Sequence, residues 1–108
     1  MEITINLYHS QLGIINGLME YLDTTQFQGQ PRHLKSIYSI CLELRETLLQ
    51  KAIKVRNKPQ DTKFKLKLSY YKADALFCYL TNYRFLYPSI YEKNLIEMIV
   101  RDLHQKLL

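Results

Sequence analysis

The chain has 108 residues, of which 47% are hydrophobic and 23% are charged, with only three glycines and three prolines. These proportions exclude a disordered or collagen-like chain, and the length predicts one globular domain over residues 1–108. The formal net charge of +5 at neutral pH favours partners that carry negative charge.

The sequence shows no membrane or secretory segment. Its longest uncharged window, from Ile3 to Met19, is shorter than the roughly 20 apolar residues that cross a bilayer, and it contains polar side chains. No basic region and cleavage site flank an apolar core near Met1, so we expect a cytoplasmic protein without a membrane partner. Cys41 and Cys78 lie far apart in apolar surroundings, and we expect both to be buried thiols.

The first two predicted helices show apolar residues at steps of three and four. The first helix begins near Tyr8 and ends near Asp23, and its apolar face consists of Tyr8, Leu12, Ile15, Met19 and Leu22. The second carries Leu34, Ile37, Cys41, Leu44 and Leu48. A flanking row is expected to widen its buried arc: Tyr38, Leu42, Leu49 and Ile53. A polar connector containing Pro59 follows and reverses the chain.

The third predicted helix begins in an ambiguous segment. Residues 63–70 alternate charged and apolar side chains, as a half-buried strand does, so a strand stays open as the alternative there. We favour a helix because a spacing of three and four continues beyond the length of a typical strand. The residues with this spacing are Leu66, Tyr70, Ala73, Phe77 and Leu80.

The fourth predicted helix starts with the spacing of a capping box, formed by Ser89 and Glu92. Its apolar face comprises Leu95, Met98, Ile99, Leu103 and Leu107. Four helices with short connectors favour up-and-down packing. The sequence therefore predicts an all-α fold, an antiparallel up-and-down four-helix bundle.

No residue pattern indicates an enzyme or a bound cofactor. The three histidines, His9, His33 and His104, belong to different helices, and none has a second metal ligand at a suitable spacing on the same face. Acidic pairs such as Glu43 and Glu46 are typical of solvated helix surfaces. We expect no catalytic residues, no metal site and no cofactor.

Positive charge is concentrated in one part of the sequence. Eight basic residues and the single acid Asp61 lie between positions 51 and 72, whereas the rest of the chain has a formal charge of −2. The eight are Lys51, Lys54, Arg56, Lys58, Lys63, Lys65, Lys67 and Lys72. On two antiparallel helices they would meet at one end of the bundle, which suits phosphates or an acidic protein surface. A basic end that only solvates the protein is the alternative.

A second apolar row on the third predicted helix indicates self-association. It consists of Phe64, Leu68, Tyr71, Ala75 and Tyr79. A bundle this small cannot bury two rows of one helix, and an exposed row of this length would favour association. We therefore predict a homo-oligomer with these residues at its interface.

Residues 32–105 resemble a family of small basic helical proteins. The features that carry the resemblance are Arg32-His33-Leu34 at the start of the second helix, residues 48–52 near its end, the basic connector, Lys65-Leu66, residues 75, 76 and 80, and a fourth helix opening near Tyr91. The family comprises the accessory variability determinants of diversity-generating retroelements and the related ribosomal RNA intervening-sequence proteins. The resemblance implies a four-helix bundle in a ring-like oligomer, commonly a pentamer, that engages nucleic acid and a reverse transcriptase.

Two functions remain as expectations. The first is a non-enzymatic oligomeric protein that binds RNA or DNA, or a nucleic-acid enzyme, through its basic hairpin, as a retroelement accessory protein. The second is a protein-interaction or structural module that binds no nucleic acid.

Overall fold

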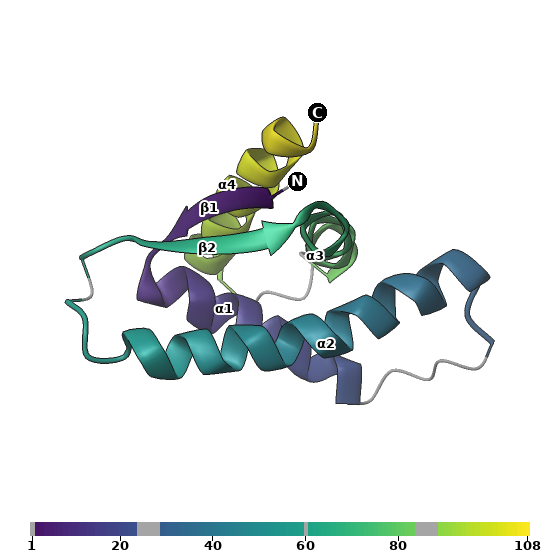
Figure 1. Ribbon diagram of the computed structural model, residues 1–108, viewed down its shortest axis with the longest axis horizontal. Helices are drawn as coiled ribbons and strands as arrows, with labels where there is room; N and C mark the ends of the chain where they lie inside the picture. The colour runs from purple at the N-terminus through teal and green to yellow at the C-terminus, as the bar shows by residue number, and fades with distance from the viewer. Residues whose placement is uncertain (1, 24–28, 60, 84–88) are drawn as a thin grey trace.

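The computed structural model of the protein describes residues 2–23, 29–59, 61–83 and 89–108. Its elements are β1 (Glu2–Leu7), α1 (His9–Met19), the 3-10 helix η1 (Glu20–Asp23), α2 (Arg32–Val55), β2 (Phe64–Ser69), α3 (Tyr70–Tyr83) and α4 (Ile90–Leu107) (Figure 1). The fold is mostly helical, but it contains a sheet. The prediction of an all-α four-helix bundle is therefore wrong.

The two strands pair antiparallel although about 60 residues separate them in the sequence. The opposed residues on the inner face are Ile3 with Leu68, Ile5 with Leu66, and Leu7 with Phe64. All six are buried, which follows from the alternation of apolar and polar side chains in both segments. The prediction of a helix over residues 63–70 is wrong, and the strand left open as the alternative is correct. A strand here satisfies its backbone groups against β1 and directs three apolar side chains into the core.

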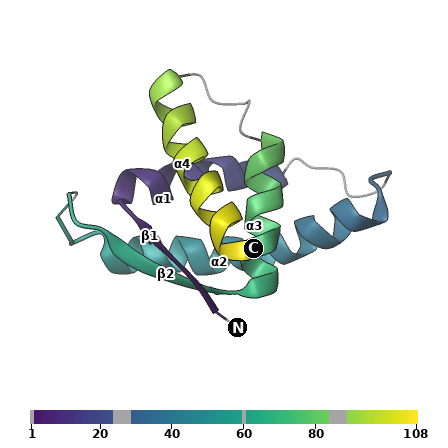
Figure 2. The same ribbon diagram turned by 90° about the horizontal axis from the view of Figure 1, so that it is seen from above.

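The helices do not form a parallel array: α2 and α3 cross steeply, whereas α1 and α2 both run across the view in Figure 1 and Figure 2. In Figure 1, α2 runs across the view while α3 is seen nearly end-on, and the turned view in Figure 2 shows the same crossing. In Figure 1, α1 lies between the sheet and α2, and α4 packs beside β1. The N-terminal end of α2 projects beyond the rest of the molecule in both views.

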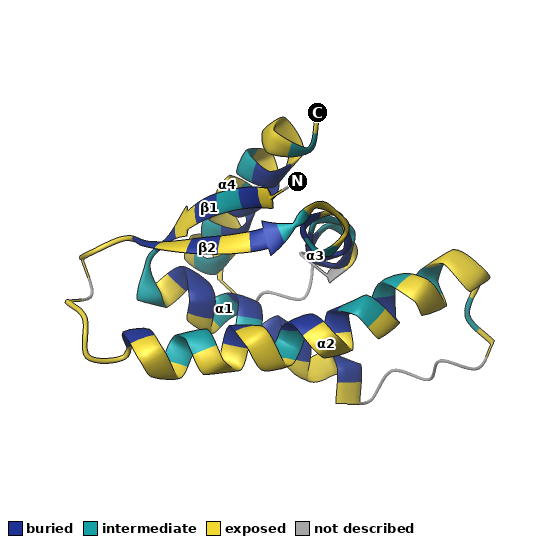
Figure 3. Cartoon of the chain, viewed as in Figure 1, coloured by how far each residue is buried: buried dark blue, intermediate teal, exposed yellow. Residues whose placement is uncertain are grey.

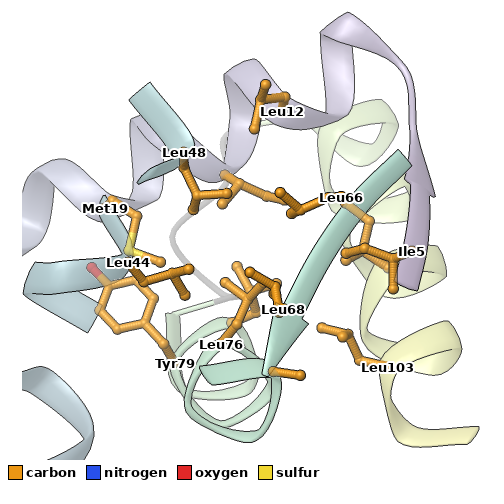
Figure 4. Close-up of a cluster of buried hydrophobic side chains, with 14 of the residues drawn as sticks. Ile5, Leu12, Met19, Leu44, Leu48, Leu66, Leu68, Leu76, Tyr79 and Leu103 are labelled. Atoms are coloured by element: carbon orange, nitrogen blue, oxygen red, sulfur yellow. The ribbon is translucent and has the colours of Figure 1, made fainter. Parts of the chain in front are cut away.

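The core lies where the sheet meets the helices. Figure 4 shows Leu12 of α1, Leu48 of α2 and Leu66 of β2 pointing into a shared interior, with Tyr79 of α3 beside Leu44. Each is no more than 3% exposed. Burying a leucine side chain fully contributes roughly 1.5–3 kcal/mol, so a single interior of this kind holds the elements together.

The apolar row assigned to an oligomer interface belongs instead to this core. Phe64, Leu68, Ala75 and Tyr79 are all no more than 4% exposed within the single chain, and only Tyr71, at 54%, faces solvent. The row is not one face of a helix, because Phe64 and Leu68 lie on β2 and the other three on α3. The expectation of a second, unpartnered helix face is wrong for this physical reason.

Contacts at the element ends fix α4 to its neighbours. The Oγ of Ser89 accepts a hydrogen bond from the Glu92 amide at 3.1 Å, which confirms the predicted N-cap. At the other end, the hydroxyl of Tyr70 donates to the Leu107 carbonyl at 2.6 Å, and Nζ of Lys106 donates to the Thr4 carbonyl at 2.5 Å. None of the described helices has the length and apolar character needed to cross a bilayer.

Candidate nucleic-acid interface

The eight basic residues predicted to bind nucleic acid follow the chain from α2 through the connector and β2 into α3. Lys51 and Lys54 lie in the last turns of α2, and Lys65 and Lys67 lie on β2. The other four are distributed over the connector and α3: Arg56, Lys58, Lys63 and Lys72. The end of α2 and the strand β2 flank the connector, so basic side chains from both elements come together.

On α2 the polar side of the last turns faces outward because the apolar side is buried. Leu44, Leu48 and Val55 are no more than 2% exposed. The residues between them at helical spacing, Thr47, Gln50, Lys51 and Lys54, share another face. Burial of the leucines thus determines where these two lysines project.

On β2, successive side chains point to opposite faces of the sheet, so burial of one face determines which residues are exposed on the other. Phe64, Leu66 and Leu68 are buried, so the intervening Lys65 and Lys67 are exposed on the outer face. In the register of the sheet they lie opposite Asn6 and Thr4 of β1, neither of which is acidic. Their ammonium groups therefore have no carboxylate directly across the sheet.

The two elements enclose a groove that we call the lysine groove. It has a volume of about 420 Å³ and is lined by Thr47, Gln50, Lys51, Lys54, Lys65, Leu66 and Lys67. Four of these seven residues are lysines and none is acidic. The ammonium of Lys51 also lies 5.7 Å from the centre of the Phe64 ring, a cation–π contact that orients it beside the strand.

The positive charge of the lysine groove is not neutralised within the described residues. Ion pairs there join Arg45 to Asp23 and Lys106 to Asp102, and none of the four groove lysines takes part in one. Like charges held side by side without counter-charges produce a positive potential that attracts anions. The groove can therefore hold a chain of negative groups, such as phosphates, without first breaking internal ion pairs.

The remaining four predicted residues lie outside the groove lining. The ammonium of Lys63 lies 5.2 Å from the Tyr8 ring centre, and that of Lys72 lies 6.0 Å from the Tyr71 ring centre. Arg56 and Lys58 are exposed after the end of α2. The structure thus brings half of the predicted set into one groove and distributes the other half around it.

Sequence reasoning missed the two neutral polar residues of the groove, Thr47 and Gln50. Their signal is the helical spacing that places them on the face of Lys51 and Lys54, but this signal becomes specific only once β2 is known to lie opposite. Two of the three histidines pack against aromatic rings: His9 lies edge-on to Phe64, and His104 stacks on Phe77. His33 is exposed on α2.

The cysteines also lie outside the groove. Cys41 is buried and its Sγ donates to the Ala75 carbonyl at 3.7 Å, whereas Cys78 is half-buried, and both are free thiols. Burial raises the pKa of Cys41 to about 12, with a smaller contribution from the nearby Cys78 thiol. The expectation of a buried thiol is confirmed for Cys41, whereas Cys78 is only partly buried.

Comparison of the chain with protein-family models, with curated proteins and with solved structures finds no match. Support for a function therefore comes from the geometry of the site itself.

Proposed function

We propose that the protein is a non-enzymatic nucleic-acid-binding protein that holds a phosphate backbone in its lysine groove. The observation that carries the proposal is that Lys51 and Lys54 of α2 and Lys65 and Lys67 of β2 line one groove without an acidic neighbour. Lysine is a flexible point charge, suited to phosphates rather than to the edges of particular bases.

The binding free energy in this proposal comes from the release of counterions. Each lysine that neutralises a phosphate frees condensed cations, so affinity falls with salt by a logarithmic slope of about −0.9 per phosphate on duplex DNA and about −0.7 on single strands. No lining residue has a planar donor–acceptor pattern directed at a base except Gln50, so we expect little sequence preference.

The test is a titration of labelled single-stranded RNA and duplex DNA at several salt concentrations. The groove variant carries Lys54→Gln, Lys65→Gln and Lys67→Gln, which remove charge without reversing it. On duplex DNA we expect the magnitude of the salt slope to fall by up to about 2.7, one phosphate for each lysine removed.

A matched control variant carries Lys35→Gln, Lys93→Gln and Arg101→Gln. These three residues are exposed and lie outside the groove lining, and the change in net charge is the same. The control should keep most of the affinity and the slope. Equal losses in both variants would assign binding to overall charge, and no binding of either nucleic acid at low salt would refute the proposal.

A protein-interaction module is the second candidate function, and the sheet gives a specific reason for it. In the described part of the chain the sheet has two strands, so β2 has one edge without a neighbouring strand, and this strand lines the groove. An extended peptide could add to such an edge through its backbone hydrogen bonds, without using the lysine charges. Charge reversal by Lys54→Glu, Lys58→Glu and Lys65→Glu should leave a partner with an uncharged interface bound and release a nucleic acid.

Two further expectations stay predictions. A reverse transcriptase as partner, and a role as a retroelement accessory protein, were implied by the family resemblance alone. The fold differs from the four-helix bundle that this resemblance implies. Nucleic-acid binding through the lysine groove does not depend on either of them.

A further inference from the structure

A second concave site lies between β1, the start of α1 and α4. It has a volume of about 220 Å³, and its polar lining includes Tyr8, Gln11, Lys63, Asp102 and Lys106. It shares no lining residue with the lysine groove. Pockets for drug-sized ligands hold roughly 300–1,000 Å³, so this one suits a smaller molecule.

Gln11 is the buried polar side chain of this pocket. It is 5% exposed, and its Oε1 accepts a hydrogen bond from the Tyr8 amide at 2.9 Å. That bond fixes the orientation of the carboxamide, because the oxygen faces the backbone and Nε2 is left at the other end. Among the described residues no acceptor bonds to Nε2. Nε2 is not one of the buried side-chain atoms that lack a partner in the described residues, so it is accessible and can donate to a ligand acceptor.

Two lysines add positive charge to the same pocket. Nζ of Lys106 donates to the Thr4 carbonyl at 2.5 Å and lies 3.3 Å from Oδ2 of Asp102, so one of its three donors remains for a ligand. Nζ of Lys63 faces the Tyr8 ring at 5.2 Å and forms no ion pair within the described residues. With two ammonium groups against one carboxylate, the lining has a net positive charge.

The start of α1 reinforces this charge. Its first turn, which includes Gln11, has no acidic residue, so the positive end of the helix dipole has no internal counter-charge there. Met98 and Ile99 form an apolar wall beside these donors. The pocket therefore combines several donors and a positive charge with room for a small molecule.

We propose that this pocket binds a small molecule through an oxyanion group, a phosphate or a carboxylate. The oxyanion accepts hydrogen bonds from Nζ of Lys63, Nζ of Lys106 and Nε2 of Gln11. Hydrogen bonds to charged groups are stronger than neutral ones, so the two lysines supply most of the affinity. The apolar wall contacts whatever short body the oxyanion carries.

The test is a titration of ¹⁵N-labelled protein followed by amide and side-chain NMR signals. One arm uses inorganic phosphate, a second uses acetate, and a third uses sodium chloride at the same ionic strength. We expect saturable shifts of the Gln11 side-chain amide and of Tyr8 in at least one oxyanion arm and not with chloride. The oxyanion that binds with the higher affinity, phosphate or acetate, shows whether the ligand is a phosphate compound or a carboxylate.

Substitutions of the two lining lysines test whether the oxyanion binds in this pocket. Lys63→Met and Lys106→Met keep the aliphatic stems but remove the charges, and each should weaken oxyanion binding about tenfold or more. Lys93→Met is the matched control, because Lys93 is exposed on α4 outside the pocket. The unliganded spectra show whether Lys106→Met preserves the fold, and Lys63→Met tests the site without touching the Thr4 contact.

Three results would overturn the proposal. They are the absence of saturable shifts with both oxyanions, unchanged affinity in Lys63→Met, and an equal loss in Lys93→Met. Because nucleic-acid binding is measured through the lysine groove variants, either proposal can fail while the other stands.

Discussion

Two tyrosine hydroxyls make chemically similar hydrogen bonds in different surroundings. The hydroxyl of Tyr79 donates to the Leu18 carbonyl at 2.6 Å in the core, where it joins α3 to the last turn of α1. The hydroxyl of Tyr70 donates to the Leu107 carbonyl at the same distance but at the surface. Carbonyls in the last turn of a helix generally lack intrahelical partners, so the Tyr70 bond helps to satisfy the end of α4. The Leu18 carbonyl also accepts from the Glu20 amide, so the Tyr79 bond is its second.

Replacing Tyr79 by Phe should therefore lower the free energy of unfolding more than replacing Tyr70 by Phe. A buried hydrogen bond contributes about 0.5–1.5 kcal/mol, whereas water replaces the donor at the exposed site and the loss there should stay below about 0.5 kcal/mol. Urea denaturation of both variants measures the difference. Equal losses would show that burial does not determine the strength of these bonds.

The two cysteines should differ in reactivity toward a thiol reagent. The thiolate is the reactive form, and burial raises the pKa of Cys41 to about 12, so almost none of it is ionised near pH 8. The pKa of Cys78 is raised too, by burial and by the nearby Asp74, but its side chain is half-buried and accessible. We expect Cys78 to react first, and Cys41 only as the protein unfolds.

Thiol equivalents titrated with and without denaturant measure this order. In Cys78→Ser, the rapidly reacting equivalent should disappear. A fast equivalent that persists in this variant would contradict the burial of Cys41.

At the scale of the element, local pattern predicted the helices better than the strands. α2 and α4 carry apolar residues at steps of three and four over many turns, and Ser89 marks the start of α4. The local pattern does not predict β1 and favours a helix at β2, because six alternating residues are too few to distinguish a strand from the end of a helix. The strand conformation of both segments depends on the pairing of β1 with β2. These segments are too far apart in the sequence for a short stretch of residues to reveal their contact.

The same limit applies to the candidate site. The excess of lysine between positions 51 and 72 is evident from the sequence, and half of these residues do line the lysine groove. The groove itself was not predictable, because its two walls are a helix face and a strand face with different periods. Lys65 and Lys67 share one face only if the segment is a strand.

A pair of substitutions at Lys67 tests the strand directly. Lys67 is exposed and lies opposite Thr4 on β1. Lys67→Thr creates a Thr–Thr cross-strand pair, whereas Lys67→Ala does not, so the Thr variant should be more stable by about 0.5–1 kcal/mol. Alanine is the better helix former, so a helix at this position would reverse the order. Urea unfolding of the two variants measures the sign.

At the scale of the whole molecule, the structure changes which surface could form the interface of a homo-oligomer. The row assigned to the interface is buried except for Tyr71, but α2 carries large apolar side chains that are exposed. Figure 3 shows the exposed positions along α2 in yellow. Leu42, Leu49 and Ile53 are 43%, 43% and 61% exposed. Their spacing of seven and four places them along one side of the helix. These residues had been expected to widen the buried arc of α2, and the structure shows that this expectation is wrong.

We expect self-association to depend on this side of α2. Sedimentation at tens of micromolar is expected to give more than one chain per particle, and Leu49→Glu with Ile53→Glu should yield a monomer, because charges cannot be buried unpaired. Leu108→Glu is a control at an exposed apolar residue outside α2. A wild-type monomer at that concentration would refute the prediction of a homo-oligomer.

The pairing of residues 2–7 with residues 64–69 has a consequence for how the molecule is made. A ribosome releases the first strand long before its partner exists, so the nascent chain must keep Ile3, Ile5 and Leu7 without their sheet neighbours until Ser69 has left the exit tunnel. Non-local pairings of this kind delay the folding transition and leave apolar segments open to chaperones in the meantime.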